Sequence, residues 1–492
     1  MYIQRTIDKY LLEWKNMPTH KPLLLRGARQ VGKSSAIRQL GKTFKYYIEV
    51  NFESRDDLKE IFEQLSDVHE IANRLGLIFS KPIVQGETLL FLDEIQSCPD
   101  AIKRLWFFKE DFPELHVVAA GSLLEFALKD ISSFGVGRIR SLFMYPMSFD
   151  EFLVAQGKDG LLTEKQNADY AHPLFAAFHN DLVQQYRTYL MVGGMPECVK
   201  AWIETKDYHQ CQAEQEDIQQ TYYDDFAKYA NKVDPILLRN TLQSVILQIG
   251  GKFMYSKVEG GYRADDVKKA LQMLCDAGIV KRVSHTAANG LPLGSEVNDK
   301  FRKYIYLDSG LLLSILNMDF GGSQVLTELI LAGAADDLVN KGGLAEMMLG
   351  WELVKYSNPR SQHDLYYWEN VVNGTSSEID YVIVRNMKVM PIECKAGTSG
   401  KMKSLRLFMR NKHLNDAYRC SLKNFALLEN QDAQDDNAVR RIVSVSAMLV
   451  YTRQKNIAQV FILERYFFVS IYPAAILGTC LSVFLVAVLQ LC

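Results

Sequence analysis

The sequence has no excess of charge of either sign, because 56 lysines and arginines are balanced by 58 aspartates and glutamates, for a net charge of −2. No global positive field therefore draws the whole molecule onto nucleic acid or anionic lipid, and such binding has to come from local patches. Cysteine is also scarce, with eight residues scattered from Cys98 to Cys492 and no CxxC pair. This usage fits neither a zinc site nor a disulfide framework and favours a reducing cytoplasm.

The two ends of the chain differ in charge. Charged and apolar residues alternate over residues 1–14, which predicts an amphipathic helix instead of a secretory signal. Residues 466–492 contain no charged residue and are long enough to cross roughly 30 Å of hydrocarbon as a helix. Pro473 and Gly478 favour the alternative of a buried strand followed by a packed apolar helix. We expect a cytoplasmic protein, with anchoring to the inner face of the membrane by residues 466–492 as the alternative.

A glycine-rich loop follows the apolar run at residues 23–25 and opens a helical stretch that reaches Leu40. Its GxxxxGK[ST] spacing lets backbone N–H groups fold around a phosphate at a helix N-terminus. Lys33 is expected to neutralise phosphate charge, and the Ser34 hydroxyl to ligate Mg²⁺. The predicted nucleotide-binding residues are Gly27, Ala28, Arg29, Gln30, Val31, Gly32, Lys33, Ser34 and Ser35.

A buried-type strand at residues 88–93 ends in the adjacent carboxylates Asp93 and Glu94. Parallel strands place such ends at the ligand crevice of a sheet. We therefore expect Asp93 to hold Mg²⁺ through water and Glu94 to orient the water that attacks the γ-phosphate. A solvated acidic turn is the plainer interpretation of an Asp-Glu pair, but it is uncommon about 60 residues after a phosphate-binding loop.

Two further residues complete the predicted catalytic set. Ser122 follows an apolar strand, from which it could face the γ-phosphate as a sensor. Arg138 follows a Ser-Ser-Phe-Gly stretch, and an arginine there could stabilise transition-state charge in cis or across a subunit boundary of a homo-oligomer. A surface role without catalytic function is the alternative for Arg138.

Several segments carry a resemblance to a known family. They read RGARQVGKSS, LLFLDEIQ, VVAAGSLLEF, GVGRIRSLFMYPMSFDEFL, YLMVGGMPECV and YIYLDSGLLLSIL. Together they resemble a widespread bacterial and archaeal family of AAA-like ATPases with a C-terminal domain of unknown function. The resemblance spans nearly the whole chain and implies an ATPase core with these residues in nucleotide roles. A guanine-reading NKxD motif is missing, and this absence together with the resemblance favours ATP.

Helical periodicity dominates the middle of the chain from residue 217 to residue 284, with a strand near its end. The order of helices and strands resembles a winged helix, which the family resemblance also implies. Lys268 and Lys269 on the second helix, with Lys281 and Arg282 on the wing, could contact the phosphates of DNA or RNA. A connector without nucleic-acid contacts is equally compatible, because several aspartates lie nearby.

A second group of charged residues lies near the end of the chain. Glu393 and Lys395 project to one face of a predicted strand, Asp380 lies on the neighbouring strand, and Glu346 lies on the preceding helix. The carboxylates suit Mg²⁺, and the lysine can assist an attacking water. The pattern EIDYV…PIECKA resembles the PD-(D/E)xK nuclease fold, to which the family's C-terminal domain is related. Cleavage stays open, because a fold can persist as a binding scaffold after losing catalysis.

The 492 residues suggest about three domains. We predict an α/β protein with an AAA-like P-loop NTPase domain around a parallel sheet (1–160), a helical, winged-helix-like region (161–320), a restriction-endonuclease-like α/β domain (321–465) and the apolar tail (466–492). The favoured function is an ATP-hydrolysing switch or motor coupled to a tail domain that binds or cleaves nucleic acid. The alternative is a regulatory or scaffold protein that binds ATP and has a catalytically silent tail domain.

Overall fold

The computed structural model describes most of the chain, namely residues 2–122, 124, 125, 128, 137–228, 230, 232–319, 341–372, 375–396, 402–432 and 438–446. Residues 466–492, where the sequence allows a membrane anchor, lie outside these ranges. Within them, no helix combines the length and the hydropathy that a bilayer crossing needs.

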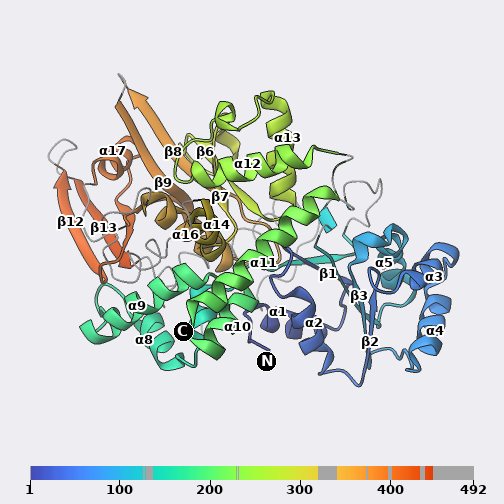
Figure 1. Cartoon of the computed structure of the whole chain (residues 1–492). Helices are drawn as coiled ribbons and strands as arrows, with labels where there is room; N and C mark the ends of the chain where they lie inside the picture. Colours follow the sequence, from blue (N-terminus) through green and yellow to red (C-terminus); the bar gives the residue numbers. More distant parts are fainter. Residues whose placement is uncertain are drawn as a thin grey trace, which may run out of the picture.

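A five-stranded parallel sheet forms the N-terminal module, with the strand order β2-β3-β4-β1-β5 (Figure 1). Its strands are β1 (Leu23–Arg26), β2 (Tyr46–Asn51), β3 (Thr88–Asp93), β4 (His116–Ala120) and β5 (Arg140–Phe143). Every residue of β3 and β4 is buried, as expected for parallel strands that are covered on both faces. The carboxyl ends of β1, β3 and β4 therefore lie side by side at one edge of the sheet.

Helices cover both faces of this sheet. Leu89 and Phe91 of β3 share a hydrophobic cluster with one set of helices, and Leu90 and Leu92 share a second cluster with another set, because successive strand residues point to opposite faces. The first set is α1 (Ile7–Lys15) and α2 (Lys33–Gly41), and the second is α3 (Lys59–Gln64), α4 (Val68–Phe79) and α5 (Pro99–Asp111).

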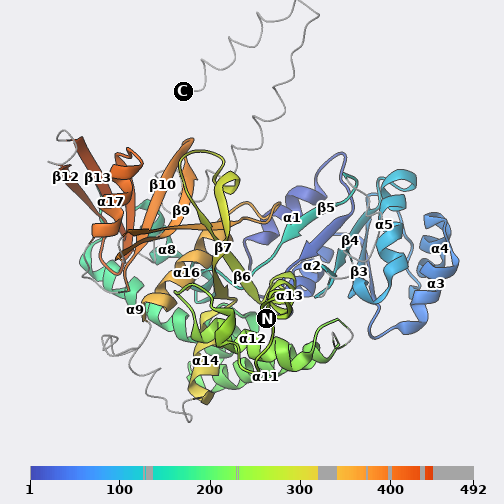
Figure 2. The same cartoon turned by 90° about the horizontal axis from the view of Figure 1, so that it is seen from above.

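Helices make up most of the middle of the chain and lie between and alongside the two sheets of the molecule (Figure 2). They are α7 (Phe149–Ala155), α8 (Asp159–Asn167), α9 (Ala176–Val192), α10 (Pro196–Thr205), α11 (Tyr208–Ala227), α12 (Pro235–Leu247), α13 (Ala264–Asp276) and α14 (Ser309–Asp319). Local sequence fixes several of their starts. Ser148 and Glu151 form a capping box at α7, and the Asp207 and Asp234 side chains cap α11 and α12.

The second sheet is mixed and has eight strands in the order β12-β13-β11-β10-β9-β8-β6-β7. Its strands are β6 (Val280–Thr286), β7 (Val297–Tyr306), β8 (Leu365–Val372), β9 (Thr375–Arg385), β10 (Lys388–Cys394), β11 (Asp416–Ser421), β12 (Ala426–Asp432) and β13 (Ala438–Ser446). Helices α16 (Lys341–Lys355) and α17 (Lys403–Asn411) contact it. Since β6 pairs with β8, strands from both sides of residue 320 share one sheet.

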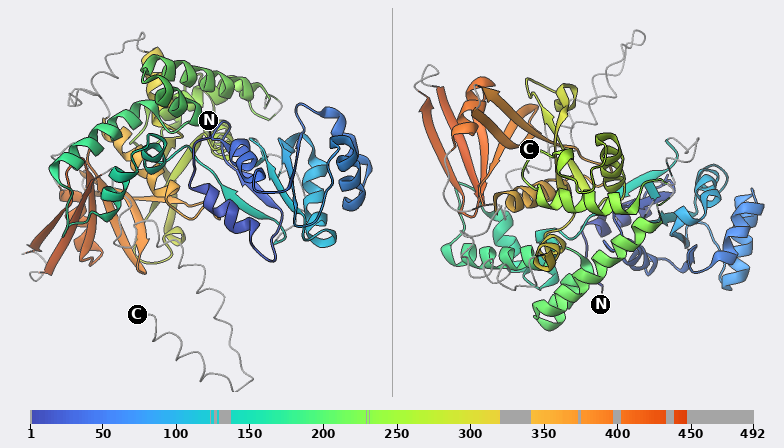
Figure 3. Two further views of the ribbon diagram at one scale, coloured as in Figure 1. Left: turned by 90° about the horizontal axis from the view of Figure 1, so that it is seen from below. Right: turned by 45° about the horizontal axis from the view of Figure 1, so that its top comes forward.

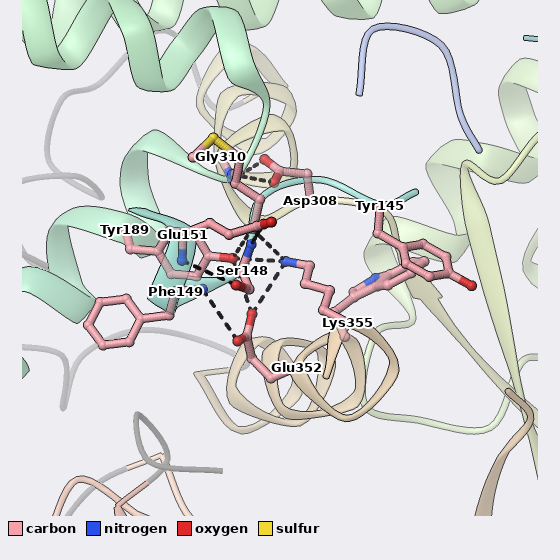
Figure 4. A network of polar contacts seen from close by, with 12 residues as sticks. Tyr145, Ser148, Phe149, Glu151, Tyr189, Asp308, Gly310, Glu352 and Lys355 are labelled. Carbon is pink, nitrogen blue, oxygen red and sulfur yellow. Dashed lines mark hydrogen bonds and ion pairs between the residues drawn. The ribbon is translucent and has the colours of Figure 1, made fainter. Parts of the chain in front are cut away.

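A buried polar network joins the three parts of the chain (Figure 4). The Lys355 ammonium on α16 donates to the carbonyl of Met147, 3.1 Å away, and to the Tyr189 hydroxyl on α9, 2.8 Å away. The Asp308 carboxylate accepts the backbone N–H groups of Gly194 and Gly310 at 2.7 and 2.9 Å. Breaking such a network leaves uncompensated buried charge, so it holds the end of the first module, the helices and α16 in one arrangement.

Candidate functional site

The predicted strand, loop and helix around the glycine-rich loop are confirmed. The loop leaves β1 at Gly27 and enters α2 at Lys33. Gly27 has a φ of +148°, and a Cβ there would lie 2.1 Å from the Met144 carbonyl oxygen. Gly32 also has a positive φ, +97°, immediately before the helix. Only glycine fits both conditions without strain, and the turn leaves the N-terminal N–H groups of α2 available to an anion.

Lys33 lies folded over its own loop. Its ammonium donates to the carbonyl oxygens of Gly27 and Ala28 at 2.9 and 2.7 Å. Burial lowers the pKa of Lys33 to about 8, although Glu94 and Asp93 act in the opposite direction. In the described part of the chain, no carboxylate forms an ion pair with this lysine. A bound phosphate would therefore contact an ammonium whose hydrogen-bond partners in the described ranges are neutral backbone carbonyls.

Ser34 and Asp93 meet across the ends of α2 and β3. The Ser34 hydroxyl lies 3.1 Å from both carboxylate oxygens of Asp93, and the Asn51 amide donates to one of them at 3.3 Å. Burial, and after it the Glu94 carboxylate, raise the pKa of Asp93. A hydroxyl and a buried carboxylate at this spacing are oxygen ligands that fit a divalent metal beside a phosphate.

Glu94 occupies a strained position directly after β3. Its φ is +50°, which is uncommon for a residue with a side chain and is typical of functional sites. The Gln96 amide donates to its carboxylate at 2.6 Å. The backbone N–H and the hydroxyl of Ser122 each lie 3.4 Å from the same oxygen. The structure thus brings the predicted water-orienting residue and the predicted sensor together.

A pocket of about 630 Å³ opens beside these residues. The loop and the start of α2, including Lys33 and Ser34, line it together with Glu94 and Ser122. The sequence did not single out several other lining residues. They are Tyr2 and Ile3 near the N-terminus, Pro196, Glu197 and Lys200 of α10, and Glu214, Asp217 and Ile218 of α11.

Two contacts hold the loop to α11, whose C-terminal end reaches the first sheet (Figure 3). The Arg29 guanidinium forms an ion pair with Asp225 at 2.7 Å, and the Tyr222 hydroxyl donates to the Arg29 carbonyl at 2.9 Å. Asp225 and Tyr222 lie almost 200 residues away from Arg29, with sequence separations of 196 and 193. No local pattern could have found them.

Arg5 holds the other side of the loop. Its guanidinium donates to the Val31 carbonyl at 2.9 Å and to the Tyr145 carbonyl at 2.7 Å, and it lies 3.2 Å from the Glu151 carboxylate. Sequence reasoning missed this residue, because it only counted Arg5 as one charge of an amphipathic helix.

Arg138 lies apart from this pocket and does not line it. Its guanidinium pairs with Glu110 at 2.7 Å and lies 4.3 Å from the centre of the Trp106 ring. A catalytic role in the same chain would require these contacts to break. The role across a subunit boundary stays a prediction.

The basic residues of the middle module face other protein groups. Lys268 pairs with Asp265 at 2.9 Å and lines, with Lys281 and Arg282, a pocket of about 220 Å³ that the phosphate loop also lines. Burial lowers the pKa of Lys281. Lys268, Lys281 and Arg282 thus lie beside the phosphate loop, whereas the Lys269 side chain is 70% exposed and lies 3.8 Å from Asp266. A nucleic-acid contact through these residues stays a prediction.

The second group of predicted residues also comes together. Glu346 of α16 and Asp380 of β9 lie with Glu378 so that one oxygen of each is within 4.8 Å of the others. Glu393 and Lys395 pair with each other beside this cluster. Burial raises the pKa values of Glu346, Asp380 and Glu393. Glu378 was missed, although it stands two positions before Asp380 and therefore shares its face of the strand.

An additional lysine lies inside the acidic cluster. The Lys303 ammonium of β7 is 2.8 Å from a Glu346 oxygen and also pairs with Glu378. Burial opposes the charge of Lys303, but the two carboxylates outweigh it and raise its pKa. The carboxylate cluster therefore already contains a cation from the chain.

Comparisons with known families match three separate segments of the chain. Residues 19–153 match the model described as an AAA domain. Residues 183–320 match a domain of unknown function, DUF8612, and residues 341–455 match another domain of unknown function, DUF4143. No curated protein matches the chain significantly.

Several solved structures are similar to the chain. A Walker-type ATPase of Pyrococcus abyssi is 14% identical, with 64% of this chain and 96% of that chain covered and a TM-score of 0.42. The ORC1 protein of Aeropyrum pernix, in complex with DNA, is 15% identical, with 64% and 93% covered and a TM-score of 0.28. The Cdc6p protein of Pyrobaculum aerophilum is 10% identical, with 68% and 96% covered and a TM-score of 0.25. The AAA-domain match and the loop geometry together make the N-terminal module an AAA-type P-loop ATPase domain.

Proposed function

We propose that the protein hydrolyses ATP with Mg²⁺ and uses its nucleotide state as a switch that α11 transmits to the rest of the chain. One observation carries this proposal: the loop that would hold the phosphates is itself bound by the Arg29–Asp225 ion pair and by the Tyr222 hydroxyl. A change in the loop on nucleotide binding would therefore act directly on α11.

The residues of the pocket take distinct roles in hydrolysis. Bound MgATP supplies the transferable phosphoryl group and a metal charge that offsets the charge developing on its oxygens. Ser34 and Asp93 would hold the metal, and Lys33 would leave its two backbone carbonyls to contact the phosphates. Glu94 would position the attacking water, while Ser122 reports on the γ-phosphate through the Glu94 oxygen that both it and Gln96 contact.

The pocket walls explain how binding could change the conformation. Residues of α10 and α11 line the pocket together with the loop, so a nucleotide would contact both the ATPase module and the middle module. A ligand shifts a conformational equilibrium only by its different affinity for the two states. A nucleotide that bridges two modules has such a difference, because its contacts are complete only when the modules are close.

Glu94→Gln separates this switch from a protein that only binds ATP. The variant should bind ATP and release almost no phosphate. Under the switch hypothesis it should hold α11 protected from hydrogen exchange for as long as ATP is present, whereas the wild type loses protection as ATP is consumed. Identical exchange of α11 in both proteins, with and without ATP, would support the regulatory scaffold instead.

A competing hypothesis for the tail module rests on the cluster of Glu346, Glu378 and Asp380, which is the only potential metal-binding group of three or more such residues in the described ranges. It is the metal-dependent cleavage of DNA or RNA by the tail module, with Glu393 and Lys395 at the same site. The test is incubation of the full chain with Mg²⁺ or Mn²⁺ and mixed DNA and RNA. Cleavage that persists in Lys395→Ala would argue against this site. The hypothesis also requires the cluster to accept a metal ion.

A further inference from the structure

We propose that Lys303 is the resident cation of the tail carboxylate cluster of Glu346, Glu378 and Asp380, where it pairs with Glu346 and Glu378 in place of a divalent metal ion. This cluster then does not serve metal-dependent cleavage by the tail module. This inference does not rest on the ATPase function, because none of these residues lines the nucleotide pocket.

The position of Lys303 carries the first step. Its side chain is 1% exposed, and its ammonium contacts one oxygen of Glu346 and one of Glu378. It also lies 5.1 Å from the centre of the Tyr367 ring, which attracts a cation through its face. An ammonium has three donors, and these neighbours surround it on several sides.

Two of the four remaining oxygens of the cluster carry the second step. One Asp380 oxygen accepts the backbone N–H of Cys394 at 2.6 Å. The second Glu346 oxygen faces backbone, since a Cβ built on Gly250 would lie 3.6 Å from it. Mg²⁺ demands close to octahedral geometry with oxygens at about 2.0–2.1 Å. At the contacted oxygens of Glu346 and Glu378, the metal ion would have to compete with a buried ammonium.

One observation points the other way. The second oxygen of Glu393 is buried and accepts no hydrogen bond from any residue in the described ranges. Its partner oxygen is taken by Lys395. Glu393 pairs with Lys395 and does not belong to the group of three carboxylates whose oxygens lie within 4.8 Å of one another. Its second oxygen therefore offers a metal ion a single ligand, which is not a complete coordination site.

Lys303 and its carboxylate partners come from two different segments of the chain. Lys303 lies in the segment that matches one family and Glu346, Glu378 and Asp380 lie in the segment that matches another. The ion pairs therefore fasten β7 to α16 and β9 across the two segments. A metal ion in place of Lys303 would remove this connection.

The test uses the full chain with Asp93→Asn, so that Mn²⁺ binding at the ATPase site does not contribute. Binding of Mn²⁺ without nucleotide is measured by water-proton relaxation, and thermal unfolding is recorded in EDTA and in Mn²⁺. The parent should bind Mn²⁺ only in the millimolar range, with no shift in Tm. Lys303→Met should lower Tm in EDTA, bind Mn²⁺ at least tenfold more tightly and recover Tm when Mn²⁺ is added.

Two further variants make the result specific. Lys300→Met on the same strand, whose side chain is exposed, should behave as the parent does. Adding Glu346→Gln to Lys303→Met should remove the Mn²⁺ response. Micromolar Mn²⁺ binding by the parent that Glu346→Gln abolishes would overturn the proposal, and this measurement needs no Lys303 variant to fold. Manganese-dependent cleavage of DNA by the parent, lost in Glu346→Gln, would overturn it as well.

Discussion

Two buried lysines in this molecule lie close to carboxylates, and their surroundings differ in one respect. Lys33 of the phosphate loop donates to two backbone carbonyls, at 2.9 and 2.7 Å. Lys303 of the tail cluster donates to two carboxylates. Burial lowers the pKa of Lys33, whereas Glu346 and Glu378 overcome burial and raise the pKa of Lys303.

The difference indicates that Lys33 can still pair with an added anion, whereas Lys303 is already paired with two carboxylates of the chain. Backbone carbonyls carry partial charges, so a phosphate can replace them at Lys33 with a net gain in charge pairing. Displacing the carboxylates of Lys303 would leave buried charges unpaired, which is strongly destabilising. The same residue type thus serves binding in one module and cohesion in the other. Four substitutions can break or sharpen this comparison.

The largest effect is expected for Lys33→Ala. Hydrolysis should fall by about a thousandfold, because the variant loses a preorganised donor to the transferring phosphoryl group in a site shielded from water. ATP affinity should fall with it. Phosphate release under saturating ATP and binding of a fluorescent ATP analogue measure the two effects. Lys45→Ala is the matched control, since Lys45 is exposed and pairs with Glu87. Undiminished nucleotide affinity in Lys33→Ala would refute the assignment of the loop.

A smaller loss of ATP hydrolysis is expected for Glu94→Gln, because the variant keeps every proposed phosphate contact. Turnover should fall by about a hundredfold through the loss of a group that orients the attacking water, while ATP affinity stays within about threefold of the wild type. The matched control is Glu87→Gln, whose side chain is 44% exposed and pairs with Lys45 in the same module. If affinity fell as much as turnover, Glu94 would be a ligand-binding group and not a catalytic one.

The geometry of the proposed phosphate site could be predicted because its information is local. Gly27 to Ser34 are contiguous, and their spacing alone specifies a turn at a helix N-terminus. Asp93 and Glu94 follow from the rule that parallel strands end at a common crevice. Gln96 escaped prediction, because a glutamine after an acidic pair carries no pattern of its own. Asp225 escaped because its partner Arg29 lies 196 residues away.

The tail cluster could be predicted only in part from local sequence patterns. The predicted carboxylates Glu346 and Asp380 do come together, and strand alternation could have added Glu378. Lys303 could not be found in this way, since it precedes Glu346 by 43 residues and belongs to a strand that the predicted boundary at residue 320 assigns to another domain. The pairing of β6 with β8 is a tertiary contact that periodicity does not encode.

A pair of buried histidines, His20 and His116, extends the comparison to basic side chains that contact backbone carbonyls and no carboxylate among the described residues. His20 and His116 stack with centroids 3.8 Å apart, and each directs a ring nitrogen at a backbone carbonyl. Burial lowers the pKa of both, that of His116 to about 4, with Lys15 and Lys109 adding to the effect and Glu114 opposing it at His20. Since these pKa values lie below those of the unfolded chain, the unfolded state takes up protons first as pH falls.

The stability that this pair contributes should therefore be complete above pH 6.5 and decline as pH falls toward 4. We expect a loss on the order of 2 kcal/mol at His116, discounted for partial access of water. Urea unfolding of wild type and His116→Gln at pH 7 and pH 5 measures it, with His172→Gln as an exposed control. Equal pH dependence in all three proteins would exclude a contribution from the stacked pair.

The smallest effect is expected for Asp225→Asn, which tests whether the loop of Lys33 communicates with α11. The amide keeps the shape and one hydrogen bond to Arg29 but loses the ion pairs with Arg29 and with Lys228. This loss should cost about 1 kcal/mol, because the two basic side chains are 27% and 48% exposed and water screens the pairs. Hydrolysis should stay within about threefold of the wild type, since Asp225 does not line the nucleotide pocket.

Protection of α11 from hydrogen exchange by ATP should weaken in Asp225→Asn, more clearly around Asp225 than around Tyr222, because the Tyr222 hydroxyl still holds the Arg29 carbonyl. Asp224→Asn is the matched control, because its carboxylate accepts from Gln220 on the exposed side of the same helix. If α11 stayed fully protected in Asp225→Asn, communication would have to run through another contact with the loop. Gly278 is the next such contact, since a Cβ there would lie 3.3 Å from the Ala28 nitrogen, and the middle module would then sense the loop through packing and not through charge.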